Sequence, residues 1–157
     1  MSNLLSDYLN QETMRANVKV ENWQQAGKIA GKLLVEKGTI KPEYIQAMLE
    51  LVMEKGPYIV VAPGIAMFHA RPEDGVNSIG LSLITPQDGV IFNAGKKDPV
   101  KLVFVLAAID NNSHVELISD LTRLLRNEAL QEKMIKADTV EQLVKIIENY
   151  ENNKEEK

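Results

Sequence analysis

Two side chains that suit phosphoryl transfer stand two residues apart, His69 and Arg71, and His69 is one of only two histidines in the chain. Pro72 pushes Arg71 towards extended backbone, in which residues two apart point the same way. The imidazole and the guanidinium would then project side by side, about 6 to 7 Å apart along the chain. A neutral imidazole nitrogen can attack phosphorus while a guanidinium holds the phosphoryl oxygens.

The second histidine, His114, opens a helix that the apolar spacing predicts from His114 to Arg126. Asn112 or Ser113 can cap this helix. The positive end of the helix dipole disfavours a charged imidazolium, so His114 should stay neutral and donate a hydrogen bond, and free amide groups there favour a phosphate. The alternative is that His114 only packs against or caps its own helix.

Two strands must position the histidines. His69 follows a predicted buried strand, Tyr58 to Ala62, through a loop, and His114 follows the apolar run Pro99 to Ile109. Such a run is typical of a strand covered on both faces, near the centre of a sheet. If the two strands run parallel, both imidazoles emerge at the same edge, where open α/β sheets bind ligands.

The remaining pattern alternates helices and strands, which predicts a three-layer α/β/α sandwich with a mixed, mostly parallel central sheet of about five strands. Residues 1–150 are expected to form a single domain, and residues 151–157 a polar tail that frays. Further strands are predicted at 14–20, 79–84 and 89–92, the last two as a hairpin, and further helices at 23–38, 42–56, 128–136 and 140–150.

Composition excludes several classes of function. With 157 residues, 45% of them hydrophobic and 25% charged, the chain fits one well-filled core. The net charge of -4, with its cations spread along the chain, gives no footprint for nucleic acid or an anionic membrane. No signal peptide and no apolar run of about 18 residues is visible, so the protein is predicted to be soluble and cytoplasmic.

Other chemistry lacks its usual residues. The chain has no cysteine, which removes disulfides, thiolate metal sites and cysteine nucleophiles. No H-x-x-x-H, H-E-x-x-H, P-loop, G-x-G-x-x-G or G-x-S-x-G pattern is present. We therefore expect neither a metal nor a cofactor.

Two separated segments resemble a known family. The run Ala62-Pro63-Gly64-Ile65-Ala66-Met67-Phe68-His69-Ala70-Arg71-Pro72-Glu73-Asp74-Gly75-Val76 resembles the phosphorylation-site segment of IIA components of the bacterial sugar phosphotransferase system, of the mannitol/fructose type. The run from Asp98 to Ala108, with Ser113-His114 after it, resembles that family's later strand and second active-site histidine. The similarity covers roughly Leu5 to Glu148 and looks most like the ascorbate-specific branch.

The resemblance implies a phosphohistidine relay. His69 would accept a phosphoryl group from the phosphocarrier protein HPr and hand it to a cysteine of a IIB component, in support of uptake of an ascorbate-like substrate. His114 would stabilise the phosphohistidine, Ser113 would help to stabilise the phosphate, and the membrane IIC component would be served only indirectly. The alternatives are a regulatory module whose phosphorylation state controls a partner protein, and a binding domain that is not phosphorylated.

One departure from the family concerns its arginine. Mannitol-type members of this family carry an active-site arginine in the helix before the strand. The similar region here, residues 51–55, contains no arginine. We propose Arg71 as the replacement that stabilises the phosphate, with Lys55 as a second candidate.

Another departure concerns partner docking. Phe68 stands where many relatives have proline or a small residue, and it either packs inward or adds an apolar contact for a partner. Ile65 and Met67 are further candidates for an apolar docking patch around His69, unless they fill the core beneath the loop. The exposed faces of the helices leave room for a homodimer.

Overall fold

The structure is a computed structural model that describes residues 5–110 and 112–155, and its centre is one mixed sheet of five strands in the order β1-β4-β5-β3-β2. Two neighbouring pairs, β1 with β4 and β3 with β5, are parallel, and the other two are antiparallel. The expected mixed sheet is confirmed. The strands are β1 (Met14–Val18), β2 (Val60–Ala62), β3 (Ile65–Phe68), β4 (Gly80–Pro86) and β5 (Leu102–Ala107).

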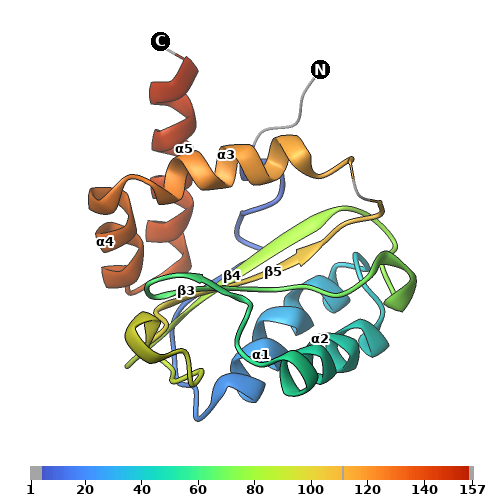
Figure 1. Cartoon of the computed structure of the whole chain (residues 1–157). Coiled ribbons are helices and arrows are strands. Elements are labelled where there is room, and N and C mark those ends of the chain that lie inside the picture. The colour runs from blue at the N-terminus through green and yellow to red at the C-terminus, as the bar shows by residue number, and fades with distance from the viewer. Residues whose placement is uncertain (1–4, 111, 156–157) are drawn as a thin grey trace.

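Helices cover both faces of this sheet, which confirms the three-layer sandwich (Figure 1). One face carries α1 (Trp23–Glu36) and α2 (Pro42–Lys55). The other carries α3 (Val115–Leu125), α4 (Glu128–Lys136) and α5 (Val140–Glu155). Short 3-10 helices lie at Leu5–Asp7, Pro72–Asp74 and Gly95–Lys97. Among the residues described, no helix is both long enough and apolar enough to cross a membrane.

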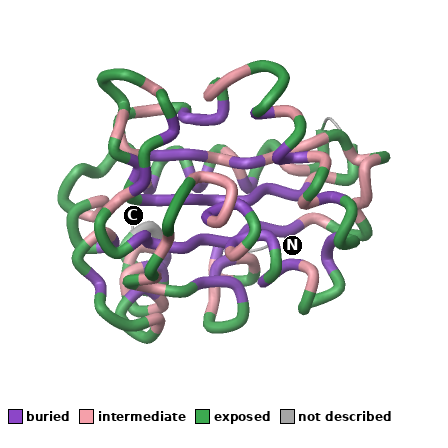
Figure 2. The backbone as a smooth tube through the Cα atoms, turned by 90° about the horizontal axis from the view of Figure 1, so that it is seen from below, coloured by how far each residue is buried: buried purple, intermediate pink, exposed green. Residues whose placement is uncertain are grey.

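The central strand is β5, as its apolar run predicts. Leu102, Phe104 and Leu106 pack in the core under α3, α4 and α5, and the alternate residues Val103 and Val105 pack in the core against α1 and α2. Side chains of a strand point alternately to the two faces, so only a strand between two helical layers can be apolar throughout. Figure 2 shows this buried centre surrounded by exposed loops.

The first two helices begin and end at the predicted signals. The side chain of Asn22 accepts a hydrogen bond from the backbone N–H of Gln25 at 2.8 Å, which caps α1. Pro42 opens α2, and Gly56, with φ of 85°, ends it in backbone that other residues rarely adopt.

The predicted hairpin of residues 79–92 is wrong. Only its first strand forms, as β4, and it pairs with β1 and β5 instead. Residues 89–92 make a single antiparallel bridge, between Val90 and Val100. Both edges of β4 are already occupied, so no backbone groups remain there for residues 89–92.

The last helix is longer than the predicted 140–150. It continues through Glu155, over most of the segment expected to be a polar tail. Glu151 is buried, and its two carboxylate oxygens accept hydrogen bonds from the backbone N–H of Ser6 at 3.2 and 3.3 Å. This contact with the first described turn holds the end of α5. Residues 156–157 of the expected tail lie outside the described residues.

Candidate functional site

His69 directly follows β3, a strand where the sequence predicts a loop. Strand β2 lies at the sheet edge and is only partly buried: Val60 is 2% exposed, as predicted, but Val61 is 54% exposed. At Gly64, whose φ is 78°, the chain turns back into β3, which runs antiparallel to β2. Strand β3 then pairs in parallel with β5, so the ends of β3 and β5 lie side by side. The two histidine-bearing segments therefore meet as expected, but through β3 rather than residues 58–62.

Both histidines line one pocket at this edge of the sheet, with a volume of about 150 Å³. His69 enters it from the end of β3, and His114 from the start of α3 after the loop that follows β5. The pocket is small enough for the two rings to serve one phosphoryl group. The described residues that line it are Tyr44, His69, Ala70, Pro72, Leu106, Ala108, Asp110 and His114.

A hydrogen bond fixes the tautomer of His69. Its Nδ1 lies 3.1 Å from the backbone oxygen of Met67. A carbonyl oxygen can only accept, so Nδ1 carries the proton, and in the neutral ring Nε2 then holds the free lone pair. The ring of Tyr58 packs against the imidazole nearly perpendicular to it, at 85° and 5.6 Å between centroids. These two contacts fix the orientation of the imidazole ring.

His114 is the N-cap residue of α3, but its side chain makes no capping hydrogen bond. The predicted caps, Asn112 and Ser113, do not cap the helix either. Their backbone N–H groups donate to Asp110 Oδ1 at 2.8 and 2.6 Å. The hydrogen bonds from Ser113 and Asn112 lower the pKa of the Asp110 carboxyl. Within the described residues, the buried Nδ1 of His114 has no hydrogen-bond partner. A buried ring nitrogen is costly to leave unpaired, so an oxygen entering the pocket would satisfy it.

Tyr44 is a pocket residue that the sequence analysis misses. Its side chain is fully buried, and its hydroxyl accepts from the backbone N–H of Ala70 at 2.9 Å and donates to the backbone oxygen of Leu106 at 2.8 Å. These bonds join the segment after β3 to the end of β5. Tyr44 lies four residues before the buried Met48 on α2, so its burial could have been predicted, but nothing in the sequence links it to His69.

We expect Tyr44→Phe to destabilise the protein by about 1 to 3 kcal/mol, because the buried N–H of Ala70 and the oxygen of Leu106 would lose their partner. The loss of these bonds should also loosen the pocket, so Tyr44→Phe should take up phosphate more slowly than the wild type. Urea unfolding measures the first effect. Tyr58→Phe is the matched control, since Tyr58 is 42% exposed, and it should change stability little. Equal stabilities of the two variants would contradict the bridging role of Tyr44.

The same residue predicts a pH dependence of stability. Burial raises the pKa of Tyr44 from 10.0 to about 12. The folded state holds the proton of the Tyr44 hydroxyl more tightly than the unfolded state does. The stabilisation by this protonated hydroxyl is therefore fully present below about pH 10 and is lost as the pH rises through about 12. Over that range the free energy of unfolding should fall by about 2 to 3 kcal/mol more for the wild type than for Tyr44→Phe. If the free energy of unfolding fell equally for the wild type and Tyr44→Phe over this pH range, the prediction would be contradicted.

The two candidate cations lie outside the pocket lining. Arg71 sits between the lining residues Ala70 and Pro72, but its side chain is 72% exposed, with Nε 3.4 Å from Asp74 Oδ2 and 3.8 Å from Glu73. Lys55 lines a separate, open pocket of about 480 Å³ with Tyr58 and Lys97. Ser113 is exposed beside His114.

Two of the three predicted docking residues are buried. Phe68 has no exposed surface, stacks on Trp23 at 6.5 Å between centroids and packs against Gly27, where even a Cβ would lie 2.9 Å from its ring. Ile65 is 3% exposed in the opposite core. Core packing rather than partner docking is therefore confirmed for Phe68 and Ile65. Met67 is the one of the three that is half-buried.

The described part of the chain contains no cluster of three or more His, Cys, Asp or Glu side chains placed to hold a metal ion. The pocket itself offers two imidazoles, the Tyr44 hydroxyl and backbone groups. A neutral, oriented Nε2 beside a second ring with an unpaired nitrogen suits the transfer of a group that carries oxygens, such as a phosphoryl group.

Comparison with known proteins agrees with this chemistry. The chain is 37% identical over 138 residues to the ascorbate-specific PTS system EIIA component of Escherichia coli K12, covering 87% of this chain and 90% of that protein. The solution structure of the mannitol-specific cryptic phosphotransferase enzyme IIA of E. coli matches with a TM-score of 0.81 and 37% identity, over 92% of this chain and 98% of that one.

A third relative was solved with a partner. Enzyme IIA of the E. coli mannitol system, in its complex with phosphorylated enzyme IIB, matches with a TM-score of 0.77 and 28% identity, over 89% of this chain and 96% of that one. The model of the family described as phosphoenolpyruvate-dependent sugar phosphotransferase system, EIIA 2, matches residues 7–150. As the two histidine segments predict, this chain belongs to that EIIA family.

Proposed function

We propose that the chain is a cytoplasmic phosphocarrier in which His69 receives a phosphoryl group from HPr and passes it to a cysteine of a IIB component. The observation that carries this proposal is the shared pocket of His69 and His114, with Nδ1 of His69 bonded to Met67 and Nε2 left free. The chain has no cysteine of its own, so the acceptor thiolate must come from another protein.

The transfer consists of two balanced steps. Nε2 of His69 attacks phosphorus as the bond from phosphorus to the donor's histidine nitrogen breaks. The cysteine thiolate of IIB then attacks the same phosphorus: a P–S bond forms as the P–Nε2 bond breaks, and its electron pair returns to Nε2 of His69. The bond from Nδ1 to Met67 holds the ring through both steps. No metal or nucleotide is needed for either exchange.

The surroundings of His69 stabilise the charge of the moving group. A phosphoryl group in transit spreads negative charge over its equatorial oxygens, so catalysis rests on positioned donors. The ring of His114 is such a donor, and the start of α3 adds the positive end of a helix dipole. The carboxylate of Asp110 already accepts hydrogen bonds from Asn112 and Ser113, which lessens its repulsion of a phosphate.

The partner surface consists of exposed apolar side chains around the pocket rather than those predicted. Tyr58, Ile109 and Val115 are 42%, 47% and 55% exposed. Tyr58 contacts the ring of His69, Ile109 precedes the lining residue Asp110, and Val115 follows His114. Donor and acceptor must use this same small surface in turn, which requires weak, transient interfaces.

Sequential phosphate transfer tests the proposal. Incubation with phosphoenolpyruvate, the phosphorylating enzyme of the system and HPr should add one acid-labile phosphate per chain. Addition of an ascorbate-type IIB protein should then remove it, because ascorbate-specific EIIA components are 37% identical to this chain. Failure to take up phosphate would overturn the relay. Uptake without transfer to any IIB protein would instead favour the regulatory alternative.

Arg71 is proposed to reach the phosphate after leaving its present partners. Exposed ion pairs such as those with Glu73 and Asp74 are worth at most about 1 kcal/mol, so a doubly charged phosphate can displace them. We expect Arg71→Ala to slow phosphate uptake by about tenfold. Lys55→Ala, the control, should transfer at the wild-type rate. If Arg71→Ala also transfers at that rate, Arg71 only caps the turn at Pro72–Asp74.

A further inference from the structure

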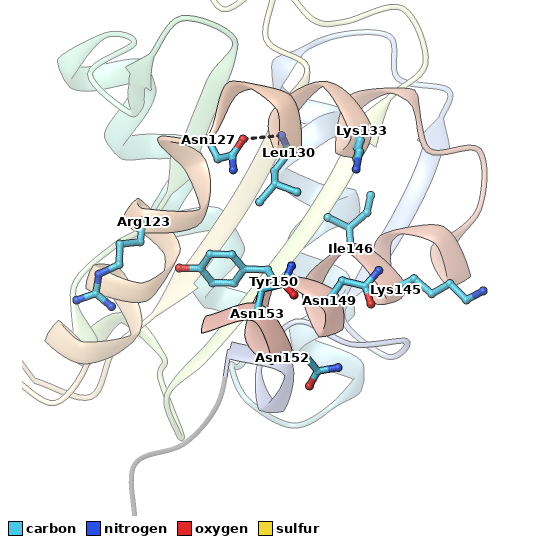
Figure 3. A pocket seen from close by; sticks show the side chains of 10 residues that line it. All are labelled: Arg123, Asn127, Leu130, Lys133, Lys145, Ile146, Asn149, Tyr150, Asn152 and Asn153. Atoms are coloured by element: carbon cyan, nitrogen blue, oxygen red, sulfur yellow. Dashed lines mark hydrogen bonds between the residues drawn. The ribbon is translucent and has the colours of Figure 1, made fainter. Parts of the chain in front are cut away.

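A second, wider pocket, of about 840 Å³, lies between α3, α4 and α5, on the same face of the sheet as α3 (Figure 3). Helix α3 links the two sites: His114 lies at its beginning and Arg123 in its last turn. The nine positions from His114 to Arg123 correspond to a rise of about 14 Å along the helix at 1.5 Å per residue. The wide pocket is lined by Arg123, Asn127, Leu130, Lys133, Lys145, Ile146, Asn149, Tyr150, Asn152 and Asn153.

The charge of this lining is opposite to that of the protein. Among the ten described residues of the lining, three are cations, four are asparagines and none is a carboxylate, whereas the whole chain has a net charge of -4. Helical spacing produces the segregation. Asn127, Leu130 and Lys133 stand three apart on one face of α4, while Glu128 and Glu132 of the same helix do not line the pocket.

The middle of the pocket is apolar and its ends are charged. Leu130, Ile146 and Tyr150 are half-buried, and Figure 3 shows Leu130 and Ile146 pointing into the space between α4 and α5. In the same view the side chains of Arg123 and Lys145 extend to opposite ends. The cations therefore do not converge on one point, as they would around a small anion, but flank an apolar strip.

We propose that this groove docks an amphipathic acidic helix of a second protein. The apolar face of such a helix would cover Leu130, Ile146 and Tyr150, as in other helix-in-groove complexes. Its carboxylates would meet Lys133, Lys145 and Arg123, while the asparagines bond polar groups at the rim. Arg123 already pairs with Asp120 at 3.1 Å, so the two lysines carry most of the available charge. The groove is independent of the proposed relay and can be occupied whether or not His69 is phosphorylated.

Binding of two designed peptides tests the groove. Both are fluorescein-labelled amphipathic helices with the same leucine face, flanked by glutamate in one and by lysine in the other. We expect the wild-type chain to bind the glutamate peptide about tenfold more tightly than the lysine peptide. NMR shifts should change at the residues that line the groove. Equal affinities, or no binding of the glutamate peptide, would overturn the proposal.

Charge reversal makes the test specific. In the double variant Lys133→Glu, Lys145→Glu the preference should switch to the lysine peptide, and in Lys133→Gln, Lys145→Gln it should disappear. The control Lys19→Glu, Lys28→Glu changes the net charge equally at exposed sites outside the groove and should keep the wild-type preference. A control that switches as well would leave only a net-charge effect, which overturns the proposal. The proposal would also be overturned if free citrate displaced the glutamate peptide completely from the same residues, because the groove would then be a simple anion site. Phosphate uptake by His69 should remain at the wild-type rate in every variant.

Discussion

His69→Ala is expected to take up no phosphate from phosphorylated HPr. The variant lacks the free Nε2 on which the proposed transfer depends. The other histidine, His114, lies at the start of α3, and its proposed role is to donate to the phosphoryl oxygens rather than to attack phosphorus. The measurement is incorporation of acid-labile label from phosphoenolpyruvate, followed over a time long enough for full phosphorylation of the wild type.

The His69→Ala variant should remain folded. The imidazole of His69 is only half-buried and makes one hydrogen bond, to Met67, so its removal should cost little free energy of unfolding. Urea unfolding should therefore give nearly the same midpoint for His69→Ala and the wild type. Label that persists in a folded His69→Ala protein would remove His69 from the relay.

His114→Ala should slow phosphate uptake by about a hundredfold without abolishing it. The proposed role of this ring is to donate to phosphoryl oxygens, and removal of one such donor typically costs about 100- to 1,000-fold in rate. The nucleophile stays in place, so the variant should still reach one phosphate per chain at long times. Rapid-quench kinetics with phosphorylated HPr separates the rate from the end point.

A conservative variant tests the reason for that loss. In His114→Gln the side-chain amide can still donate a hydrogen bond, so part of the rate should return. A packing role would give a different pattern: both variants would lower the free energy of unfolding and slow transfer alike. Transfer by His114→Ala at the wild-type rate would show that only the His69 side of the pocket matters.

The relation between the two histidines could be predicted because it depends on the ends of buried strands. The apolar run that became β5 is long, and only a central strand with a helical layer on each face can bury it. The sequence predicts His69 at the same edge for a partly wrong reason, because it indicates Tyr58 to Ala62 as the strand that leads to it. The register of β3 with β5, Phe68 opposite Val105, produces the same juxtaposition.

The docking residues could not be predicted, because sequence alone does not show which face of a short strand is covered. Phe68 and Ile65 look available in a loop, but β3 places one against α1 and the other against the α3 side. Tyr44 is a similar case. Its hydrogen bonds reach Ala70 and Leu106, 26 and 62 residues away, and no local pattern encodes such distances.

By itself, the sequence determined the helices, the central strand, the family and the two histidines, because each depends on periodicity or on residues close together in the chain. Tertiary structure alone decided that β2 is an edge strand, that β3 exists and that residues 89–92 remain outside the sheet. Strands bond to whichever backbone edge is free, and that depends on the positions of all the others. The tyrosine bridge and the cationic groove arise in the same way, from elements that meet only when the chain is folded.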